Sequence, residues 1–232
     1  FMSELKLTPI KPRENSREYV FRMMYSNIMS FQLEPGTSIS EQDISSQLHI
    51  SRTPVRDAFV RLAQLQLLDI VPQRKTTVSR IRTEQIDDSC FMRQAIECII
   101  IQQACKNFPK THLKRLENNL VRQEKAVLAV DNSALFKLDE ALHKTIFEGC
   151  HRARIWDYLT TTDPNYLRTR VLITLSGTTQ MEIVYQQHSQ IVDAIRRQDA
   201  ANIVELMSQH IVRVRVLPLV ESLKKMYPHY FV

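Results

Sequence analysis

Four residues in the C-terminal half have the types and spacing of a metal site. Asp139 and His143 are four residues apart within a predicted helix, so both side chains leave the same face. His188 and His210 are each eleven residues from Asp199, a predicted N-cap between two helices. If an antiparallel hairpin turns near Asp199, both histidines lie about 16 Å from the turn and meet at one height. Three imidazoles and one carboxylate predict a site for a divalent ion such as Zn²⁺ or Ni²⁺.

The other histidines and the cysteines show no such pattern. A single histidine is more often a surface or hydrogen-bonded core residue than a ligand, and this interpretation applies to His49, His112, His151 and His229. The four cysteines form no CxxC pair, and three of them, Cys90, Cys98 and Cys105, recur at helical spacing. We therefore predict reduced cysteines in the core rather than a cysteine metal or redox centre.

A second set of residues, from Ser51 to Leu62, has the pattern of a DNA-recognition helix. Ser51 is a predicted N-cap and Pro54 falls in the first turn, where a missing N–H has little cost. Arg52, Arg56 and the more distal Arg61 recur at roughly helical spacing, opposite an apolar stripe. One face is cationic and the other is suited to a core, as a helix docked in the major groove requires.

The flanking segments predict a winged helix-turn-helix around this helix. Upstream, Pro35-Gly36 marks a turn, Ser40 is a predicted cap with Asp43 at the capping-box position, and a helix runs to about Leu48. A break at His49-Ile50 leads into the recognition helix. Downstream, residues 69–80 are rich in β-formers around a basic tip, which predicts a small hairpin wing.

Residues 17–82 resemble the winged-helix domain of the GntR family of bacterial transcriptional regulators. The family pattern is matched almost residue for residue by Leu33 to Gly36 and by Ser51 to Ala58. The resemblance implies that Arg52 and Arg56 contact bases and phosphates, supported by other side chains of the helix and wing: Thr53, Arg61, Arg74 and Lys75. Lys75 stands where the family usually has glycine at the wing tip.

Composition agrees with a mainly α-helical regulator. The chain has 232 residues, only three glycines and a net charge of +6. Residues 1–82 carry twelve basic and eight acidic side chains, whereas the other 150 residues carry nineteen and seventeen. The basic surplus is thus concentrated in the part predicted to bind DNA. No apolar run reaches the length of about 20 residues that a membrane span needs, and no signal peptide is visible, so we expect a cytoplasmic protein.

The chain from residue 83 onward is predicted to be an all-α bundle. Helices are expected over 83–104, 111–129, 132–148, 155–159, a stretch after Pro164, 180–197 and 200–217, with Pro218 ending the last one. We expect two domains, a winged helix-turn-helix at 1–82 and an all-α effector and dimerisation domain at 83–232.

The spacing of the four predicted ligands, with Ile191, Ala194 and Ile195 between them, is similar to the metal-binding form of the FCD domain. That domain accompanies the GntR module in the FadR subfamily and covers roughly 88–220 here. Leu142 and Gln187 depart from the family's usual Phe and Glu without removing a ligand. The resemblance implies an organic-acid effector, with Arg93 facing the same cavity; Arg168 and Arg170 are weaker candidates for its wall.

The predicted function is that of a homodimeric regulator, a repressor rather than an activator, that binds double-stranded operator DNA in response to a small organic acid. It is not expected to be an enzyme, because there is no His-Glu-x-x-His segment and no general base beside the four ligands. Two alternatives stay open: a metal-dependent hydrolase, and a regulator whose metal is structural or is itself the signal.

Overall fold

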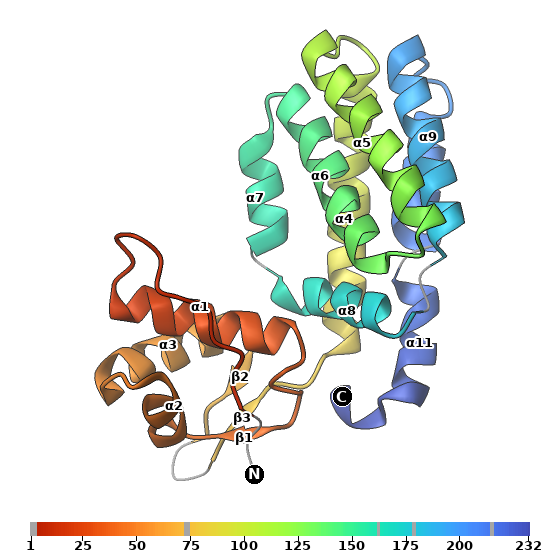
Figure 1. Ribbon diagram of the computed structural model, residues 1–232. Coiled ribbons are helices and arrows are strands. Elements are labelled where there is room, and N and C mark those ends of the chain that lie inside the picture. Colours follow the sequence, from red (N-terminus) through yellow and green to blue (C-terminus); the bar gives the residue numbers. More distant parts are fainter. Residues whose placement is uncertain (1–3, 72–74, 162, 178–179, 214–215) are drawn as a thin grey trace. The chain divides into compact units, whose positions relative to one another are not determined.

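The computed structural model describes residues 4–71, 75–161, 163–177, 180–213 and 216–232. They form two compact units (Figure 1). One contains the described residues of 4–83 together with 163–171 and 224–232, and the other contains 84–161 together with the described residues of 172–223. Two segments that the sequence analysis assigned to the C-terminal domain therefore pack within the N-terminal unit.

The N-terminal unit is built on three helices and a small antiparallel sheet. The helices are α1 (Ser16–Met29), α2 (Glu41–Leu48) and α3 (Arg52–Gln64), and the strands are β1 (Ser38–Ile39), β2 (Leu68–Asp69) and β3 (Thr76–Val78). The central strand is β3, which pairs Thr77 with Ser38 of β1 and with Asp69 of β2. α1 and α2 both pack on α3 over an apolar core that includes Val20, Ile28 and Leu62. The hairpin of β2 and β3 confirms the predicted wing up to its tip, where residues 72–74 lie outside the described part.

Local sequence explains the helix-turn-helix. The Ser40 hydroxyl accepts the Asp43 amide at 3.1 Å and donates to the Asp43 carboxylate at 2.6 Å, so Ser40 caps α2 as predicted. His49 adopts a left-handed conformation (φ 53°) that turns the chain toward α3. Ser51 is the N-cap residue of α3, as predicted, and its side chain makes no capping hydrogen bond.

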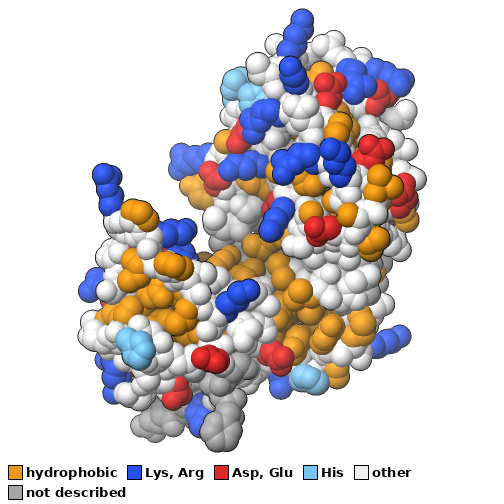
Figure 2. Space-filling view, in the orientation of Figure 1, with side chains coloured by type: hydrophobic (Ala, Val, Ile, Leu, Met, Phe, Trp, Pro, Cys, Tyr) orange, Lys and Arg blue, Asp and Glu red, His pale blue; other side chains and the backbone are white. Residues whose placement is uncertain are grey.

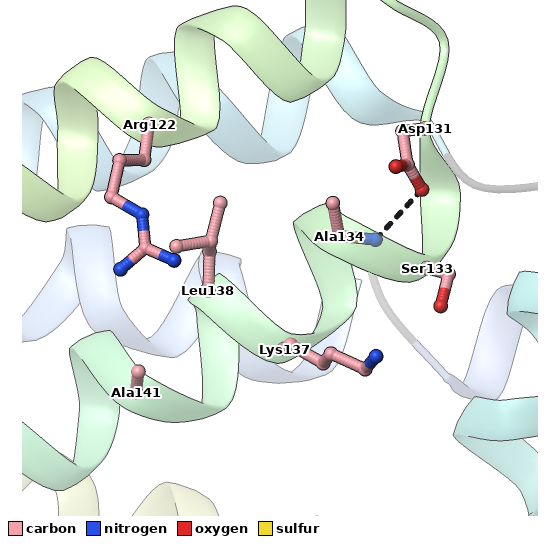
Figure 3. Close-up of a pocket in the computed structure, with 7 residues that line it drawn as sticks. All are labelled: Arg122, Asp131, Ser133, Ala134, Lys137, Leu138 and Ala141. Atoms are coloured by element: carbon pink, nitrogen blue, oxygen red, sulfur yellow. Dashed lines mark hydrogen bonds between the residues drawn. The ribbon is translucent and has the colours of Figure 1, made fainter.

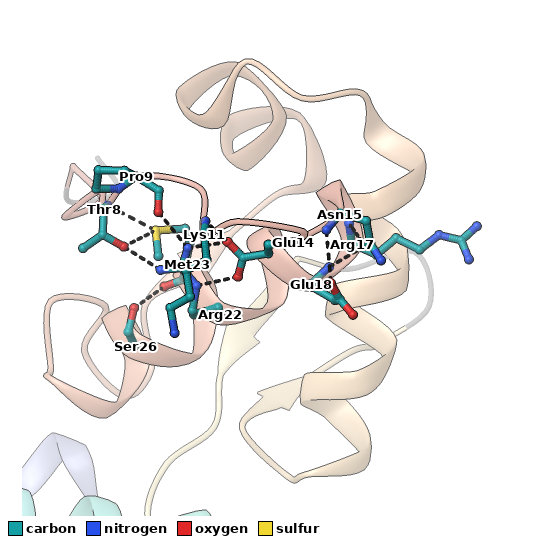
Figure 4. A network of polar contacts seen from close by, with 10 residues as sticks. All are labelled: Thr8, Pro9, Lys11, Glu14, Asn15, Arg17, Glu18, Arg22, Met23 and Ser26. Carbon is teal, nitrogen blue, oxygen red and sulfur yellow. Dashed lines mark hydrogen bonds and ion pairs between the residues drawn. The ribbon is translucent and has the colours of Figure 1, made fainter.

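The segment before α1, residues 4–15, is hydrogen-bonded along this helix in the same unit (Figure 4). Arg22 donates to Glu14 Oε1 and Oε2, both at 2.6 Å, and to Thr8 Oγ1 and the Pro9 carbonyl. The Glu14 pKa falls from 4.5 to about 2, chiefly because of the hydrogen bond from Arg22. The buried Asn27 side chain accepts a hydrogen bond from the Lys6 N–H and donates one to the Lys6 carbonyl.

Residues 163–171 contribute a buried arginine to this unit. Leu167 packs against the apolar core, and Arg168 is fully buried. Its guanidinium donates to the Ser79 carbonyl at 2.8 Å and to Asn165 Oδ1 at 2.7 Å. Burial lowers the pKa of Arg168 to about 10. The Ile81 N–H donates a hydrogen bond to the Tyr230 carbonyl near the end of the chain. This bond links residues 224–232 to the N-terminal unit.

The second unit is an all-α bundle, as predicted (Figure 1). Its elements are α4 (Thr83–Ala104), α5 (Lys110–Leu128), α6 (Asn132–Gly149), α7 (Ala153–Thr161), α9 (Met181–Arg197) and α10 (Ile203–Ser208), with parts of α8 (Pro164–Leu175) and α11 (Leu217–Met226). α5 packs on α6 and α9, and α10 returns along α9. A π-helical turn, Gln209–Arg213, follows α10, and a 3₁₀ turn, Pro228–Tyr230, follows α11.

The structure corrects two predicted helix boundaries in this half. Asp199 is not an N-cap: α9 ends at Arg197, Gln198 is left-handed, and the cap position of α10 is Asn202. Asp199 instead accepts the Ala201 amide within the turn. Pro218 does not end a helix, since it is the second residue of α11. Among the described residues, no helix is long and apolar enough to cross a bilayer.

Candidate metal centre and nucleic-acid interface

The four residues with metal-ligand spacing lie together inside the helical unit. Asp139 and His143 come from α6, His188 comes from α9, and His210 comes from the π-helical turn after α10. Each side chain offers one ligand atom, and these atoms all lie within 4.8 Å of one another. All four residues are at most 1% exposed. The structure therefore brings together the whole set that the sequence indicated.

The distances within the cluster suit a single small cation. His210 Nε2 lies 3.1 Å from Nε2 of both His143 and His188, and His188 Nε2 lies 3.1 Å from Asp139 Oδ1. Two neighbouring ligands bound at about 2.1 Å are separated by about 3.0–3.4 Å. The cluster thus has the size of one coordination shell.

The opposite ring nitrogens of the three histidines each face a side-chain oxygen. Nδ1 of His143 lies 2.5 Å from Glu97 Oε2, Nδ1 of His188 lies 2.7 Å from Gln123 Oε1, and Nδ1 of His210 lies 2.9 Å from Gln187 Oε1. If each Nδ1 carries the proton and donates outward, each Nε2 presents a lone pair to the centre. Lone pairs only 3.1 Å apart repel unless a cation lies between them. The residues present therefore fit a divalent metal ion.

Arg93 and Glu97 extend the site along α4. The Arg93 guanidinium donates to Glu97 Oε1 at 3.1 Å, while the other carboxylate oxygen faces His143. The guanidinium also lies 5.2 Å from the ring centroid of Trp156, and that ring stacks on His143. The structure thus places Arg93 beside the cluster, with Glu97 shared between the arginine and a histidine. Arg93 was expected at the cavity from the family resemblance, whereas the contact of Glu97 with His143 was not anticipated.

The remaining candidates of this half lie elsewhere. Arg170 is in the N-terminal unit, where its guanidinium lies 5.9 Å from the ring centroid of Tyr166. The cysteines are free and outside the cluster. Burial raises the pKa of Cys105 and of Cys150 to about 11, so both stay as thiols near neutral pH.

A separate depression of about 290 Å³ opens beside the start of α6 (Figure 3). It is lined by Arg122, Asp131, Ser133, Ala134, Lys137, Leu138 and Ala141. Asp131 caps α6 by accepting the Ala134 amide at 2.9 Å. Apart from Arg122 of α5 and the N-cap Asp131, these residues lie on α6, which also carries Asp139 and His143, but they include none of the four clustered side chains.

The first turn of α3 carries the side chains predicted to meet DNA. Arg52 and Arg56 are 60% and 70% exposed at the side chain, and Thr53 is exposed beside them. Both arginines are paired with Glu41 of α2, at 3.4 Å from Arg52 Nη2 and 3.1 Å from Arg56 Nε. The predicted apolar stripe, Val55, Ala58, Phe59 and Leu62, is buried. The arrangement confirms the cationic and apolar faces, and it adds Glu41, which the sequence pattern did not single out.

The other predicted DNA contacts are placed differently. Arg61 lies in the last turn of α3, with its guanidinium 4.0 Å from the Phe21 ring centroid. Lys75 is exposed just before β3, and Arg74 lies outside the described residues. On the face shown in Figure 2, Lys and Arg side chains of the N-terminal unit lie mostly around its rim. Arg17 adds an exposed cation next to α3, where it pairs with Asp57 at 2.9 Å.

Two protein families match separate parts of the chain. The family described as bacterial regulatory proteins, GntR family, matches residues 17–78, and the FCD domain family matches residues 88–213. The first range contains the helix-turn-helix with most of the wing, and the second contains all four clustered residues.

Similar proteins of known sequence are named as regulators of transcription. The chain is 28% identical to the HTH-type transcriptional repressor RspR of Escherichia coli K12, over 89% of this chain and 90% of that protein. It is 24% identical to a probable D-xylose utilization operon transcriptional repressor of Paenarthrobacter nicotinovorans, over 76% of both chains.

Solved structures share the fold. The E. coli protein McbR/YncC superposes with a TM-score of 0.67 at 16% identity, covering 92% of this chain and 99% of that one. A regulator from Rhodococcus gives a TM-score of 0.62 at 20% identity, covering 92% and 98%. With the helix-turn-helix, the all-α unit and both family matches in agreement, the chain belongs to the GntR family of DNA-binding transcriptional regulators that carry an FCD effector domain.

Proposed function

We propose that this protein is a homodimeric repressor of the FadR type that senses a small organic acid at a bound divalent metal. The observation that carries the proposal is the buried cluster of three imidazoles and one carboxylate, in which His210 Nε2 lies 3.1 Å from Nε2 of each of the other two histidines. The repressor assignment is supported by relatives named as repressors. A regulator of chromosomal DNA acts in the bacterial cytoplasm, which is the location we propose.

Operator recognition is assigned to the first turn of α3. Arg52 and Arg56 are exposed, long and cationic, so they suit guanine edges and phosphates in the major groove. Thr53 lies between them and suits a phosphate or base contact. Arg61, stacked on Phe21, and Lys75 with Arg74 of the wing are secondary contacts in this proposal.

The effector is assigned to the metal and Arg93. Asp139, His143, His188 and His210 would hold Zn²⁺ or Ni²⁺, and the bound ion would supply a Lewis-acidic anchor for a carboxylate oxygen. Arg93 is the nearby cation suited to clamp a carboxylate in a bidentate manner. Because Arg93 donates to Glu97, an incoming acid would compete with Glu97 or share the guanidinium with it.

Homodimerisation is assigned to the exposed apolar face of α4. Phe91 and Ile99 lie eight residues apart on this helix and are 75% and 66% exposed. Ala95 and Cys98 lie between them and line a depression that α10 completes. A second copy covering this face would pair two recognition helices, as a near-palindromic operator requires.

A second candidate function is favoured by the burial of the cluster. Since all four residues are at most 1% exposed, an ion there could serve the fold alone, or be the signal itself, with no organic acid bound. The two functions differ in whether any acid changes DNA affinity. We propose regulation and not catalysis in either case.

The test begins with operators selected from random duplexes by the full-length protein. Their affinity is then measured by fluorescence anisotropy, with panels of hydroxy acids, sugar acids and dicarboxylates, before and after chelation. We expect at least one acid to weaken DNA binding, and chelation to abolish that effect. If only the metal changes affinity, the second candidate function holds; if no selected DNA binds more tightly than random duplex, the proposal is wrong.

Arg56→Ala tests the DNA side of the same proposal. Loss of a guanine contact is expected to weaken operator binding by about 1–3 kcal/mol, with a smaller change on random duplex. His188→Ala should lose the metal while retaining operator binding, because the two residues lie in separate compact units. Unchanged operator affinity for Arg56→Ala would contradict its assignment.

A further inference from the structure

A chain of buried hydrogen bonds leads from the backbone of α6 to one histidine of the cluster. Asn119 Nδ2 lies 2.9 Å from the Leu138 carbonyl, and Asn119 Oδ1 lies 2.7 Å from Gln123 Nε2. Gln123 Oε1 then lies 2.7 Å from Nδ1 of His188. Gln123 and His188 are fully buried, and Asn119 is 9% exposed. Two amides of α5 therefore connect a fixed carbonyl to a residue of the cluster.

This chain of hydrogen bonds has a defined direction from donor to acceptor. A backbone carbonyl only accepts hydrogen bonds, so the Asn119 atom that faces Leu138 must be the amide nitrogen. The Asn119 oxygen then faces Gln123, which must present its own nitrogen there and its oxygen to His188. Reversing either amide would place two acceptors or two donors against each other. His188 therefore carries a proton on Nδ1, and in the neutral ring this leaves a lone pair at Nε2.

The lone pair of His188 points to the centre of the cluster. His188 Nε2 lies 3.1 Å from both Asp139 Oδ1 and His210 Nε2. The hydrogen bond from Nδ1 to Gln123 therefore holds the ring in the tautomer that ligates a metal through Nε2. His143 receives comparable support from Glu97, a charged group already paired with Arg93. The amides of α5 do the same for His188 without adding a further carboxylate to a buried site that already holds Asp139 and Glu97.

We propose that Asn119 and Gln123 are positioning residues of the metal site, an inference that rests on the metal site of the proposed function. They set the tautomer and orientation of His188 before the ion arrives. The ion therefore binds a ring that is already aligned, so Gln123 contributes to metal affinity although it does not touch the metal. The direction of the chain also assigns different roles: Gln123 acts on the ring, and Asn119 holds Gln123.

The experiment uses the full-length protein, stripped of metal by a chelator and titrated with Co²⁺ as a visible-absorbing probe. Gln123→Met keeps the length of the side chain but removes the acceptor, and we expect Co²⁺ affinity to fall by about 10- to 100-fold with an altered visible spectrum. Gln186→Met, the same substitution at an exposed position of α9, is the matched control and should change neither.

Asn119→Leu provides a second variant. It frees the Gln123 amide to rotate, so a smaller loss of affinity in the same direction is expected; this variant keeps the inference testable if Gln123→Met fails to fold. Wild-type Co²⁺ affinity and spectrum in both Gln123→Met and Asn119→Leu would overturn the inference. A wild-type protein that binds no Co²⁺ would instead overturn the metal site itself, so the two failures are distinguishable.

Discussion

Removal of the Glu41 carboxylate is expected to strengthen DNA binding. Glu41 is 22% exposed at the side chain and pairs with both arginines at the start of α3, at 3.4 Å from Arg52 and 3.1 Å from Arg56. To reach phosphates or bases, each guanidinium must leave this carboxylate or share it. Glu41→Gln keeps the shape of the side chain, removes one negative charge from the DNA-facing surface and releases both arginines.

The magnitude follows from the exposure of the two pairs. An exposed ion pair contributes about 0.2–1 kcal/mol, so releasing two of them is worth about 0.4–2 kcal/mol. Operator affinity should therefore rise by about 2- to 30-fold, and the free energy of unfolding should fall by no more than the same amount. Because the gain is electrostatic, it should shrink as salt is raised.

The assay is fluorescence anisotropy on the selected operator and on random duplex, at several salt concentrations. Asp43→Asn is the matched control, because it makes the same charge change two residues away on α2, where the carboxylate binds Ser40 and not an arginine. The reasoning is refuted if Glu41→Gln binds no more tightly than Asp43→Asn. Weaker operator binding by Glu41→Gln would mean that Glu41 aligns the arginines for DNA instead of holding them back.

Three further predictions concern stability. At 100 times its dissociation constant, Zn²⁺ should stabilise the wild type by about 2.7 kcal/mol in thermal unfolding, and His210→Ala should lose this gain while the exposed His151→Ala keeps it. The Glu14 pKa is lowered to about 2, so its contribution to stability is present above pH 4.5 and is lost as the pH falls toward 2. Glu14→Gln should flatten that part of the stability profile measured by urea unfolding, and equal steepness in both proteins would contradict the role of Arg22. Arg168→Met should destabilise the N-terminal unit by about 1–3 kcal/mol, because the Ser79 carbonyl loses a buried donor. The stability of Arg168→Lys should lie between those of the wild type and Arg168→Met. An unchanged urea midpoint for Arg168→Met would exclude this role.

The elements with strong local signals could be predicted from the sequence. The limits of α2 and α3 were predicted nearly to the residue from the Pro-Gly turn, the Ser40 cap and the break at His49. Each of these signals depends only on neighbouring residues in the sequence. The four clustered residues were also found, since one helical turn joins Asp139 to His143 and one hairpin pairs the other two.

Features that depend on tertiary packing could not be predicted. The turn between α9 and α10 uses a left-handed Gln198 and a cap position at Asn202, and His210 leaves a π-helical turn whose geometry no spacing rule anticipates. Gln123 and Asn119 look like ordinary solvated amides of an amphipathic helix until α6 and α9 cover them. Likewise, an arginine such as Arg168 has no sequence signal for full burial, and its acceptor Ser79 is 89 residues away.

The proposed metal site can be tested by measuring the metal content and ligand environment of the full-length protein after exposure to Zn²⁺ or Ni²⁺ and removal of excess ion. We expect one ion per chain, with an X-ray absorption spectrum that shows nitrogen and oxygen ligands, imidazoles among them, at about 2.0–2.2 Å. We also expect His188→Ala to lose the ion. A wild-type protein that retains no ion, or a His188→Ala variant that retains one with an unchanged spectrum, would contradict the proposed metal site.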